Sequence, residues 1–512
     1  MFRKIGATAM LLAAASSVHA ATCESLSALS LPNTTITTSQ AVAPGAFTPP
    51  VAARGRGGNL FANLPSFCRV AATLKPSSDS DIKVEVWLPS DGWNGKLQAV
   101  GNGGWAGVIS YAAMATALRA GYATVSTDTG HSSPGGMFAL GHPEKLIDYA
   151  YRSEHEMTVT AKAVVRAFFG NAPAKSYFNG CSTGGRQALV EATKYPDDFD
   201  GIIAGAAANP KTHLDAWRLW AATLAIGNDE ARIPAEKHPM IHQAVLAQCD
   251  ALDGVKDGLI ENPARCHFDP APIVCKGADP STSSGSPRAE SRGDSAECLT
   301  PKQAAVAKAL MGPAKTPAGR EIFPGYAPGS ELGWAFLLGG KEPYSNPLED
   351  YKYVIFNNPD WDWRTFDLER DLAASEKATP GLLTAVSQDL SAFTKHGGKL
   401  LMYHGWTDQQ IPPLSSVNYY RKVAPKSAQD SVRLFMVPGM NHCAGGEGPN
   451  TFDMVSPLEQ WVEHNQPPTR IVASHLTAGK VDRTRPLCAY PQVARYKGAG
   501  DINDAESFVC AK

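Results

Sequence analysis

The chain lacks an excess of charge of either sign, and this limits the partners that it can have. Its 512 residues carry 47 Lys and Arg against 49 Asp and Glu, a formal net charge of −2. Proteins that bind nucleic acids usually show a basic excess or a basic stripe, and acidic membrane surfaces also attract basic residues. We therefore expect neither a nucleic acid nor a membrane as a partner.

Long apolar runs are also missing. Beyond the N-terminus, no stretch reaches the about 18 apolar residues of a membrane-spanning helix. The N-terminus itself has the pattern of an export signal, with Arg3 and Lys4 before a short apolar run and small residues at Val18 and Ala20. We predict a signal peptide over residues 1–20 and a soluble protein that is secreted or periplasmic.

The ten cysteines include no C-x-x-C pair, so zinc and dithiol redox motifs have no support. An even number of cysteines in an exported protein favours disulfides. Pairing of neighbours along the sequence suggests Cys23–Cys68, Cys249–Cys266, Cys275–Cys298 and Cys488–Cys510. This leaves Cys181 and Cys443, which are far apart in the sequence, and the sequence alone does not prove this connectivity.

Strand and helix patterns alternate through the first part of the chain. Patterns typical of strands occur at 81–89, 122–131, 175–180 and 199–208, and 96–107 reads as a strand that runs into a glycine-rich loop. Helical spacing occurs at 154–170 and 184–196. Strand patterns return at 397–408 and 431–443. This alternation predicts an α/β fold, in which a parallel sheet carries helices on both faces.

The middle of the chain has a different composition. Residues 210–395 are rich in Trp, Pro, Gly, Asp and Cys, with less regular alternation, and include the low-complexity stretch 276–297. We interpret 210–395 as a lid domain inserted into a catalytic α/β domain that comprises 21–209 and 396–512.

A candidate nucleophile lies between a predicted strand and a predicted helix. Residues 180–184 read G-x-S-x-G, with Ser182 in the centre. In α/β-hydrolases this pattern forms a tight turn that exposes the serine at the top of the sheet. The alternative is an ordinary glycine turn with an exposed serine, because such short patterns also occur by chance.

A serine nucleophile needs a histidine base and an acid that orients the histidine. Asp408 and His442 each follow a later strand pattern, in the order Ser, Asp, His that α/β-hydrolases use. Strand ends of this kind meet in the crevice where α/β sheets place their sites. We predict that Ser182, His442 and Asp408 form a catalytic triad on an α/β-hydrolase core.

Two cysteines are the immediate neighbours of these residues, because Cys181 precedes Ser182 and Cys443 follows His442. A disulfide between them would bring their Cα atoms within about 4.4–6.8 Å and would hold the nucleophile beside its base. The alternative is that the two cysteines are buried and unrelated.

An oxyanion hole needs two backbone N–H groups that point at the developing negative charge. The residue after the nucleophile, Thr183, normally supplies one of them. For the other we choose Gly101, which lies in the glycine-rich segment 100–107 after a strand pattern.

These motifs together resemble the tannase and feruloyl esterase family. The resemblance rests on the CS-D-HC arrangement of Cys181-Ser182, Asp408 and His442-Cys443, and on "YFNGCSTGGRQAL", "YHGWTDQQIPP", "PGMNHCAGG" and the C-terminal stretch 483–510. It covers nearly the whole chain after the predicted signal peptide. It implies an α/β-hydrolase core with a large lid, five disulfides and a calcium site in the lid.

The segment 249–266 is the candidate for that calcium site. Calcium binds six to eight oxygen atoms from carboxylates and carbonyls. The resemblance assigns the ligands to Asp250, Asp253, Val255, Asp257 and Leu259. The spacing is not that of an EF-hand, and composition alone is equally compatible with a solvated acidic turn. We expect a structural Ca²⁺ and no organic cofactor.

The resemblance implies a secreted serine esterase that forms an acyl-enzyme with a small aromatic ester, either free or attached to a plant polysaccharide or polyphenol. Feruloyl and other hydroxycinnamoyl esters are the leading substrates, followed by galloyl esters and terephthalate monoesters. Lid aromatics would suit such acyl groups, although each of them is individually more typical of a lid core: Trp334, Phe336, Trp361, Trp363 and Phe366. The alternatives are a peptidase with the same triad and a non-catalytic binding protein on a hydrolase fold.

Overall fold

The computed structural model describes residues 22–50, 60–133, 135–276, 297–383, 387–425, 427 and 431–512. The predicted signal peptide and most of the low-complexity stretch lie outside these residues. Within them, no helix is long and apolar enough to cross a membrane.

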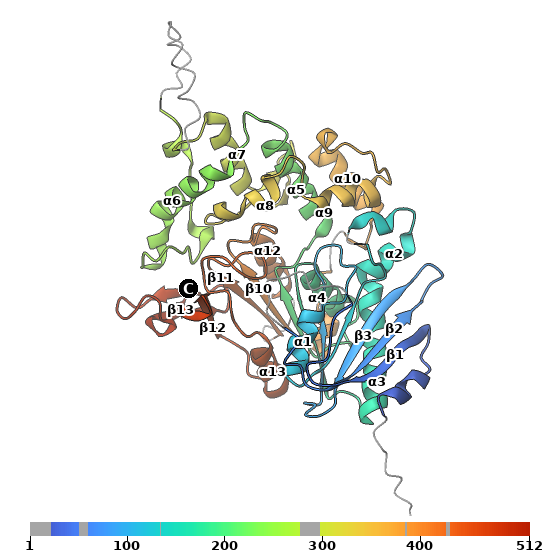
Figure 1. The fold of residues 1–512 in the computed structure, drawn as a ribbon. Helices are drawn as coiled ribbons and strands as arrows, with labels where there is room; N and C mark the ends of the chain where they lie inside the picture. The colour runs from blue at the N-terminus through green and yellow to red at the C-terminus, as the bar shows by residue number, and fades with distance from the viewer. Residues whose placement is uncertain are drawn as a thin grey trace, which may run out of the picture.

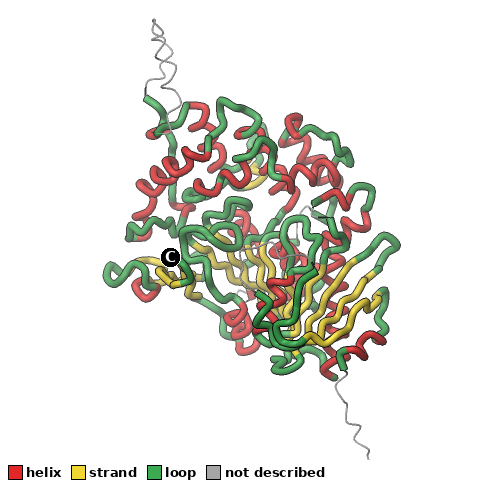
Figure 2. The backbone as a smooth tube through the Cα atoms, viewed as in Figure 1, coloured by secondary structure: helices red, strands yellow, loops and turns green. Residues whose placement is uncertain are grey.

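A nine-stranded mixed sheet forms the centre of the molecule (Figures 1 and 2). Its strand order is β1-β2-β3-β5-β4-β6-β7-β10-β11. The pairs from β1 to β5 are antiparallel and those from β5 to β11 are parallel. The strands are Thr34–Val42 (β1), Phe67–Leu74 (β2), Ile82–Pro89 (β3), Lys96–Val100 (β4), Ala123–Thr127 (β5), Lys175–Cys181 (β6), Gly201–Gly205 (β7), Lys399–Gly405 (β10) and Val432–Val437 (β11).

Helices cover both faces of this sheet, as the sequence pattern predicts. Successive residues of a strand point to opposite faces. Ile202 and Leu400 therefore lie in one apolar core, whereas Ile203 and Leu401 lie in another. The first core includes α3 (Ser153–Phe169), α4 (Thr183–Lys194), α11 (Ser391–Lys395) and α12 (Leu414–Val423); the opposite face is covered by α1 (Tyr111–Arg119) and α13 (Val455–His464).

The segment between β7 and β10 forms a helical layer above the sheet (Figure 1). Trp217, Trp334 and Leu372 are buried in a core that belongs to this layer. We retain 210–395 as the proposed extent of the lid domain. Its described helices are α5 (Lys211–Ala225), α6 (His238–Cys249), α7 (Pro301–Met311), α8 (Ala335–Leu338), α9 (Ser345–Glu349) and α10 (Leu368–Ala378), with a small sheet of β8 (Ala314–Lys315) and β9 (Glu321–Phe323). Helix α11 lies at the end of the same range but packs in the first core of the sheet.

Several short elements were not predicted from the sequence. Helix α2 (Pro143–Ile147) precedes α3, and two hairpins complete the C-terminal part. These hairpins pair β12 (Arg470–Thr477) with β13 (Lys480–Cys488) and β14 (Val493–Tyr496) with β15 (Phe508–Ala511). Arg485 of β13 forms an ion pair with Asp257 in the lid, so the first hairpin contacts the predicted calcium loop.

All five predicted disulfides are confirmed, and the described residues contain no free cysteine. Four of them join neighbours along the sequence. The fifth joins Cys181 to Cys443 across a sequence separation of 262, with their Cα atoms 6.0 Å apart.

Candidate active site

Ser182 lies in the turn between β6 and α4, where the sequence pattern places it. Its backbone has φ 65° and ψ −121°, a conformation that non-glycine residues rarely adopt. Strained residues of this kind persist only where the surrounding structure holds them, and they cluster at functional sites.

Two glycines beside Ser182 have no room for a side chain, because other backbone segments approach them closely. A Cβ atom on Gly180 would lie 2.4 Å from the carbonyl oxygen of Gly184, and one on Gly185 would lie 2.2 Å from that of Gly205. Only glycine therefore lets α4 begin so close to β6 and β7. The glycines around Ser182 are therefore required by the close packing of α4 against β6 and β7.

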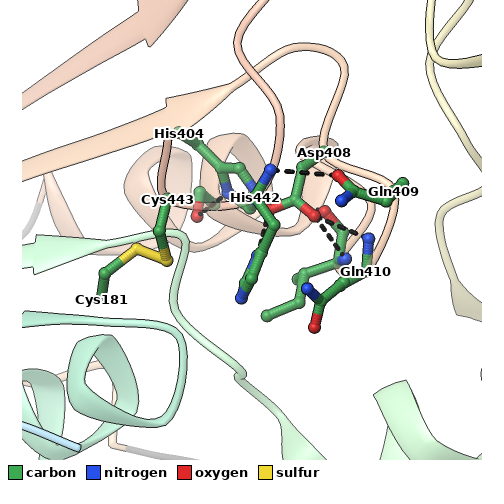
Figure 3. The surroundings of a disulfide bond; sticks show 9 residues. Cys181, His404, Asp408, Gln409, Gln410, His442 and Cys443 are labelled. Carbon is green, nitrogen blue, oxygen red and sulfur yellow. Dashed lines mark hydrogen bonds and ion pairs between the residues drawn. A yellow bond between two sulfur atoms is a disulfide. The ribbon is translucent and has the colours of Figure 1, made fainter. Parts of the chain in front are cut away.

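His442 and Asp408 come together at the ends of β11 and β10. Nδ1 of His442 lies 2.7 Å from Oδ2 of Asp408 (Figure 3). A carboxylate can only accept, so we assign the proton of the imidazole to Nδ1. Nε2 is then left without a proton and can act as a base.

Asp408 is fully buried, and its carboxylate has four hydrogen-bond partners in all, namely two histidines and two backbone amides. The amides of Gln410 and Ile411 donate to Oδ1 at 2.7 and 2.8 Å. Burial alone would raise the pKa of Asp408, but the charge of His442 and hydrogen bonds from both neighbouring histidines hold it well below its usual range. The carboxylate is therefore ionised at neutral pH.

His404 is a second histidine in contact with Asp408, and no pattern in the sequence pointed to it. Its Nε2 lies 3.0 Å from Asp408 Oδ2 and 3.1 Å from the carbonyl oxygen of Ile411, so Nε2 carries the proton (Figure 3). Nδ1 lies 2.8 Å from the Ser416 hydroxyl. The spacing His404–Asp408 was visible in the sequence, but a lone histidine in a buried strand is indistinguishable from an ordinary core residue.

The disulfide Cys181–Cys443 links the two halves of the candidate triad (Figure 3). It joins the residue before Ser182 to the residue after His442. Among the described residues, no hydrogen bond joins the Ser182 hydroxyl to His442. Such bonds are often long in ligand-free enzymes and shorten when substrate binds.

Of the two backbone N–H groups predicted to bind the oxyanion, that of Thr183 is available and that of Gly101 is not. Thr183 is the first residue of α4, and the first N–H groups of a helix have no partner within it. The choice of Gly101 is wrong, because its N–H donates to the carbonyl of Asn179 at 3.0 Å as part of the β4–β6 pairing. Gly101 instead permits close packing, since a Cβ atom there would lie 2.7 Å from Gly184 Cα.

A pocket opens beside Ser182. Its lining combines the glycine-rich loop, the start of α4, the helix α5, the lid segment around the start of α9 and the loop after β10: Gly104, Trp105, Ser182, Thr183, Ala208, Lys211, Leu214, Arg218, Tyr344, Asn346 and Gln410. The five lid aromatics suggested from the sequence are not among these residues. Trp334 and Trp363 are buried in lid cores instead, as most aromatic side chains of a helical layer are.

The tannase and feruloyl esterase family matches residues 68–511. The chain belongs to this family. Its members are carboxylic ester hydrolases, and this enzyme class fits a strained serine beside a histidine–aspartate pair. An uncharacterized esterase from Xanthomonas campestris is 36% identical, with 100% of this chain and 94% of the relative covered.

Fungal relatives of this esterase carry more specific names. A probable feruloyl esterase B from Aspergillus clavatus is 35% identical, with 89% of this chain and 88% of that protein covered. The crystal structure of feruloyl esterase B from Aspergillus oryzae has a TM-score of 0.87 and 32% identity, covering 96% of this chain and 99% of the other. It confirms the α/β-hydrolase fold.

A tannin acyl hydrolase from Aspergillus niger is more distant. It has a TM-score of 0.72 and 22% identity, covering 94% of this chain and 92% of the other. At this identity the comparison shows the fold alone.

The candidate calcium loop of the esterase is rich in internal hydrogen bonds. Asp250 Oδ1 accepts from the amides of Asp257 and Gly258 at 3.1 and 3.2 Å, and Asp257 also pairs with Arg485. Burial, and then the charge of Asp257, raise the pKa of Asp253 to about 6. Among the described residues, no group of three or more His, Cys, Asp or Glu side chains is arranged to hold a metal ion.

Removing the disulfide beside the candidate triad tests the role of this disulfide in the esterase. The double variant Cys181→Ala, Cys443→Ala should lower kcat about 10- to 100-fold, because packed loops alone then set the position of His442 relative to Ser182. Its free energy of unfolding should fall by about 2–4 kcal/mol. Steady-state kinetics and thermal unfolding measure the two effects.

The matched control is Cys488→Ala, Cys510→Ala, which removes a disulfide from the C-terminal hairpins. This control should lose stability and keep kcat within about twofold. An equal loss of kcat in both double variants would contradict a specific role for Cys181–Cys443.

Proposed function

We propose that the protein is a secreted serine esterase that hydrolyses aromatic esters, feruloyl and related hydroxycinnamoyl esters first among them. The observation that carries the proposal is the Cys181–Cys443 disulfide, which fastens the strained Ser182 turn to the loop of the His442–Asp408 pair. Two relatives above 30% identity are named feruloyl esterase B, and this favours hydroxycinnamoyl over galloyl esters.

In the proposed mechanism, Ser182 attacks the ester carbonyl while His442 Nε2 takes its proton. Asp408 keeps the imidazole in the required tautomer and stabilises the imidazolium. The Thr183 amide binds the oxyanion, together with an amide of Gly104 or Trp105 in place of that of Gly101. His442 then protonates the leaving alcohol, and water activated by the same histidine releases the acid from Ser182.

The substrate proposal is tested by measuring hydrolysis of methyl ferulate and methyl gallate side by side in the presence of calcium. We expect kcat/KM for methyl ferulate to exceed that for methyl gallate by about 10-fold or more. One contact that the enzyme makes with only one of the two acyl groups is enough for a difference of this size. Turnover of methyl gallate alone would move the assignment to tannase and keep the mechanism. Failure of folded protein to cleave either ester would contradict the substrate class and favour a terephthalate monoester or the non-catalytic alternative.

Export is proposed on the basis of the signal pattern in residues 1–20 and the five disulfides, which persist in oxidising compartments. The substrate would then be met outside the cytoplasm, either as a small ester or as an acyl group on a plant polysaccharide or polyphenol.

We also propose a structural Ca²⁺ in the lid, held by the side chains of Asp250, Asp253 and Asp257 and the carbonyls of Val255 and Leu259. The supporting observations are the partly buried carboxylates of Asp253 and Asp257 in one short loop, and the Cys249–Cys266 disulfide that closes it. Hard oxygen donors of this kind suit calcium. When bound, the ion would neutralise the carboxylates of Asp250 and Asp253, while Asp257 would have to exchange its ion pair with Arg485 for the metal. Ester hydrolysis by the serine does not require the ion.

Chelation tests the calcium proposal. EDTA should lower the free energy of unfolding of the wild type by about 3–4 kcal/mol if free calcium was 100–1,000 times its Kd. Asp253→Asn should remove most of this response, whereas the control Asp482→Asn, on the exposed C-terminal hairpin, should retain it. A wild-type melting temperature that is equal with EDTA and with calcium would contradict the site.

A further inference from the structure

The pocket beside Ser182 contains two cations on one face of α5. Residues 211, 214, 215 and 218 follow helical spacing, and Lys211, Leu214 and Arg218 line the pocket. Lys211 is 6% exposed and Arg218 is 7% exposed, although Lys and Arg are rarely buried unless they are paired.

Buried carboxylates hold both cations in place. Nζ of Lys211 lies 2.6 Å from Asp215 Oδ2 and 3.1 Å from Asp350 Oδ2. Nη1 of Arg218 donates to Asp215 Oδ1 at 3.0 Å, while Nε and Nη2 donate to the carbonyl of Gln410. Asp215 and Asp350 are fully buried, so the carboxylates lie behind the cations rather than in the pocket.

Aromatic rings orient the same cations. The ammonium of Lys211 lies 4.0 Å from the ring centre of Trp105, and the guanidinium of Arg218 lies 5.5 Å from that of Tyr344. Trp105 is 2% exposed, and its Nε1 has no hydrogen-bond partner among the described residues. The pocket therefore offers a charged ammonium, a guanidinium and ring surfaces, a combination that suits an electron-rich aromatic group bearing acceptor oxygens.

The charge balance of this cluster depends on Asp350. Burial and the like charge of Asp215 raise the pKa of Asp350 to about 7, although the charge of Lys211 opposes this rise. When Asp350 is ionised, the two carboxylates balance Lys211 and Arg218; when Asp350 takes up a proton, one positive charge is left uncompensated. An anionic oxygen from a ligand would then restore the balance.

Ser182 and Thr183, the proposed nucleophile and oxyanion donor, both line this pocket. His442, which must reach the leaving alcohol in order to protonate it, is not among the described residues of the lining. The acyl group on Ser182 is therefore the part of the ester that we assign to this pocket.

We propose that Lys211, supported by Arg218, binds an oxygen on the aromatic ring of the acyl group and so selects oxygen-bearing aromatic acids over unsubstituted ones. This inference rests on the proposed function, because it takes Ser182 as the nucleophile. The shared chemistry is an acceptor oxygen remote from the ester, either a phenolic hydroxyl or a carboxylate.

The test is the ratio of kcat/KM for methyl ferulate to that for methyl cinnamate, which lacks ring oxygens. The wild type should favour ferulate, and Lys211→Met should lower the ratio about 10- to 100-fold, the loss expected for one hydrogen bond to a charged donor. A ratio is unaffected by a smaller fraction of folded protein. The variant Lys211→Met, Asp350→Asn removes one charge of each sign, which avoids leaving a buried carboxylate unpaired, and should give the same result.

A matched control is Lys96→Met, since Lys96 pairs with Glu459 and Glu463 outside the pocket. This control should keep the wild-type ratio of kcat/KM for methyl ferulate to kcat/KM for methyl cinnamate. The same kcat/KM ratio is measured for monomethyl terephthalate and methyl benzoate, which differ by a carboxylate. If the ferulate–cinnamate pair gives the larger wild-type ratio, the oxygen is a phenolic one; if the terephthalate–benzoate pair does, it is a carboxylate oxygen.

A wild type that cleaves both members of each pair equally well, or Lys211 variants that keep the wild-type ratio within about twofold, would overturn the inference while leaving the serine esterase intact. Loss of all turnover in wild-type protein would instead overturn the proposed function.

Discussion

Ser182→Ala should lower kcat/KM for methyl ferulate by about 10⁴- to 10⁶-fold. In the proposed mechanism the Ser182 hydroxyl forms the acyl-enzyme, whereas the neighbouring Thr183 hydroxyl donates to the carbonyl oxygen of Gly104. The strained backbone of Ser182 is fixed by the close contacts of Gly180 and Gly185, so alanine should adopt the same conformation. The melting temperature should therefore change little, and the loss of activity can be assigned to chemistry.

The matched control for this variant is Ser176→Ala. Ser176 lies on the same strand, β6, near the end opposite to Ser182, and is buried. It should keep kcat/KM within about twofold, since it is remote from the candidate triad. Retention of more than about 1% of wild-type activity by Ser182→Ala would show that the nucleophile lies elsewhere.

Asp408→Asn should lower kcat about 10³- to 10⁴-fold with little change in KM. The neutral amide cannot stabilise the imidazolium of His442, and its NH₂ group would face the proton on His404 Nε2 or on His442 Nδ1. The pKa of Asp408 lies well below its usual range, so the wild-type carboxylate remains charged as the pH falls toward about 5. The defect should therefore persist from about pH 5 to 8 in a pH–rate profile.

Asp371→Asn is the control for the aspartate, because Asp371 is also buried and ion-paired but lies in the lid. It should reduce stability without a large change in kcat. Equal effects of the two substitutions on kcat would mean that Asp408 acts through folding rather than through His442.

The sequence predicts the structure best where a residue type has few structural uses. The glycines around Ser182 indicated a tight turn, and the structure shows why no side chain fits at Gly180 or Gly185. The cysteines beside Ser182 and His442 predicted a contact across a sequence separation of 262. Both features constrain the backbone directly, so a pattern in the sequence is enough to reveal them.

The sequence was misleading where the same residue type can have either a structural or a catalytic role. Gly101 had the expected position for an oxyanion donor, but its amide completes the pairing of β4 with β6, and its missing side chain makes room for α4. His404 was overlooked because burial in a strand hides its contact with Asp408. Neither distinction is visible without the register of the strands.

The pocket beside Ser182 could not be predicted for a similar reason. Trp334 and Trp363 suggested an aromatic lid surface, yet both are buried in lid cores, while Trp105, Tyr344 and Lys211 line the pocket. Lys211 had no motif to mark it. Only the folded chain brings the start of α5, the glycine-rich loop and the segment before α9 to one place.

The central claim is that Ser182 is a nucleophile activated by His442, and the most direct measurement is mass spectrometry after treatment with diethyl p-nitrophenyl phosphate, which phosphorylates activated serines. We predict one diethylphosphoryl group per chain, located on the peptide that contains Ser182, absent from Ser182→Ala and formed far more slowly in His442→Ala. Labelling of another residue, or full activity in protein whose Ser182 is completely labelled, would contradict the account.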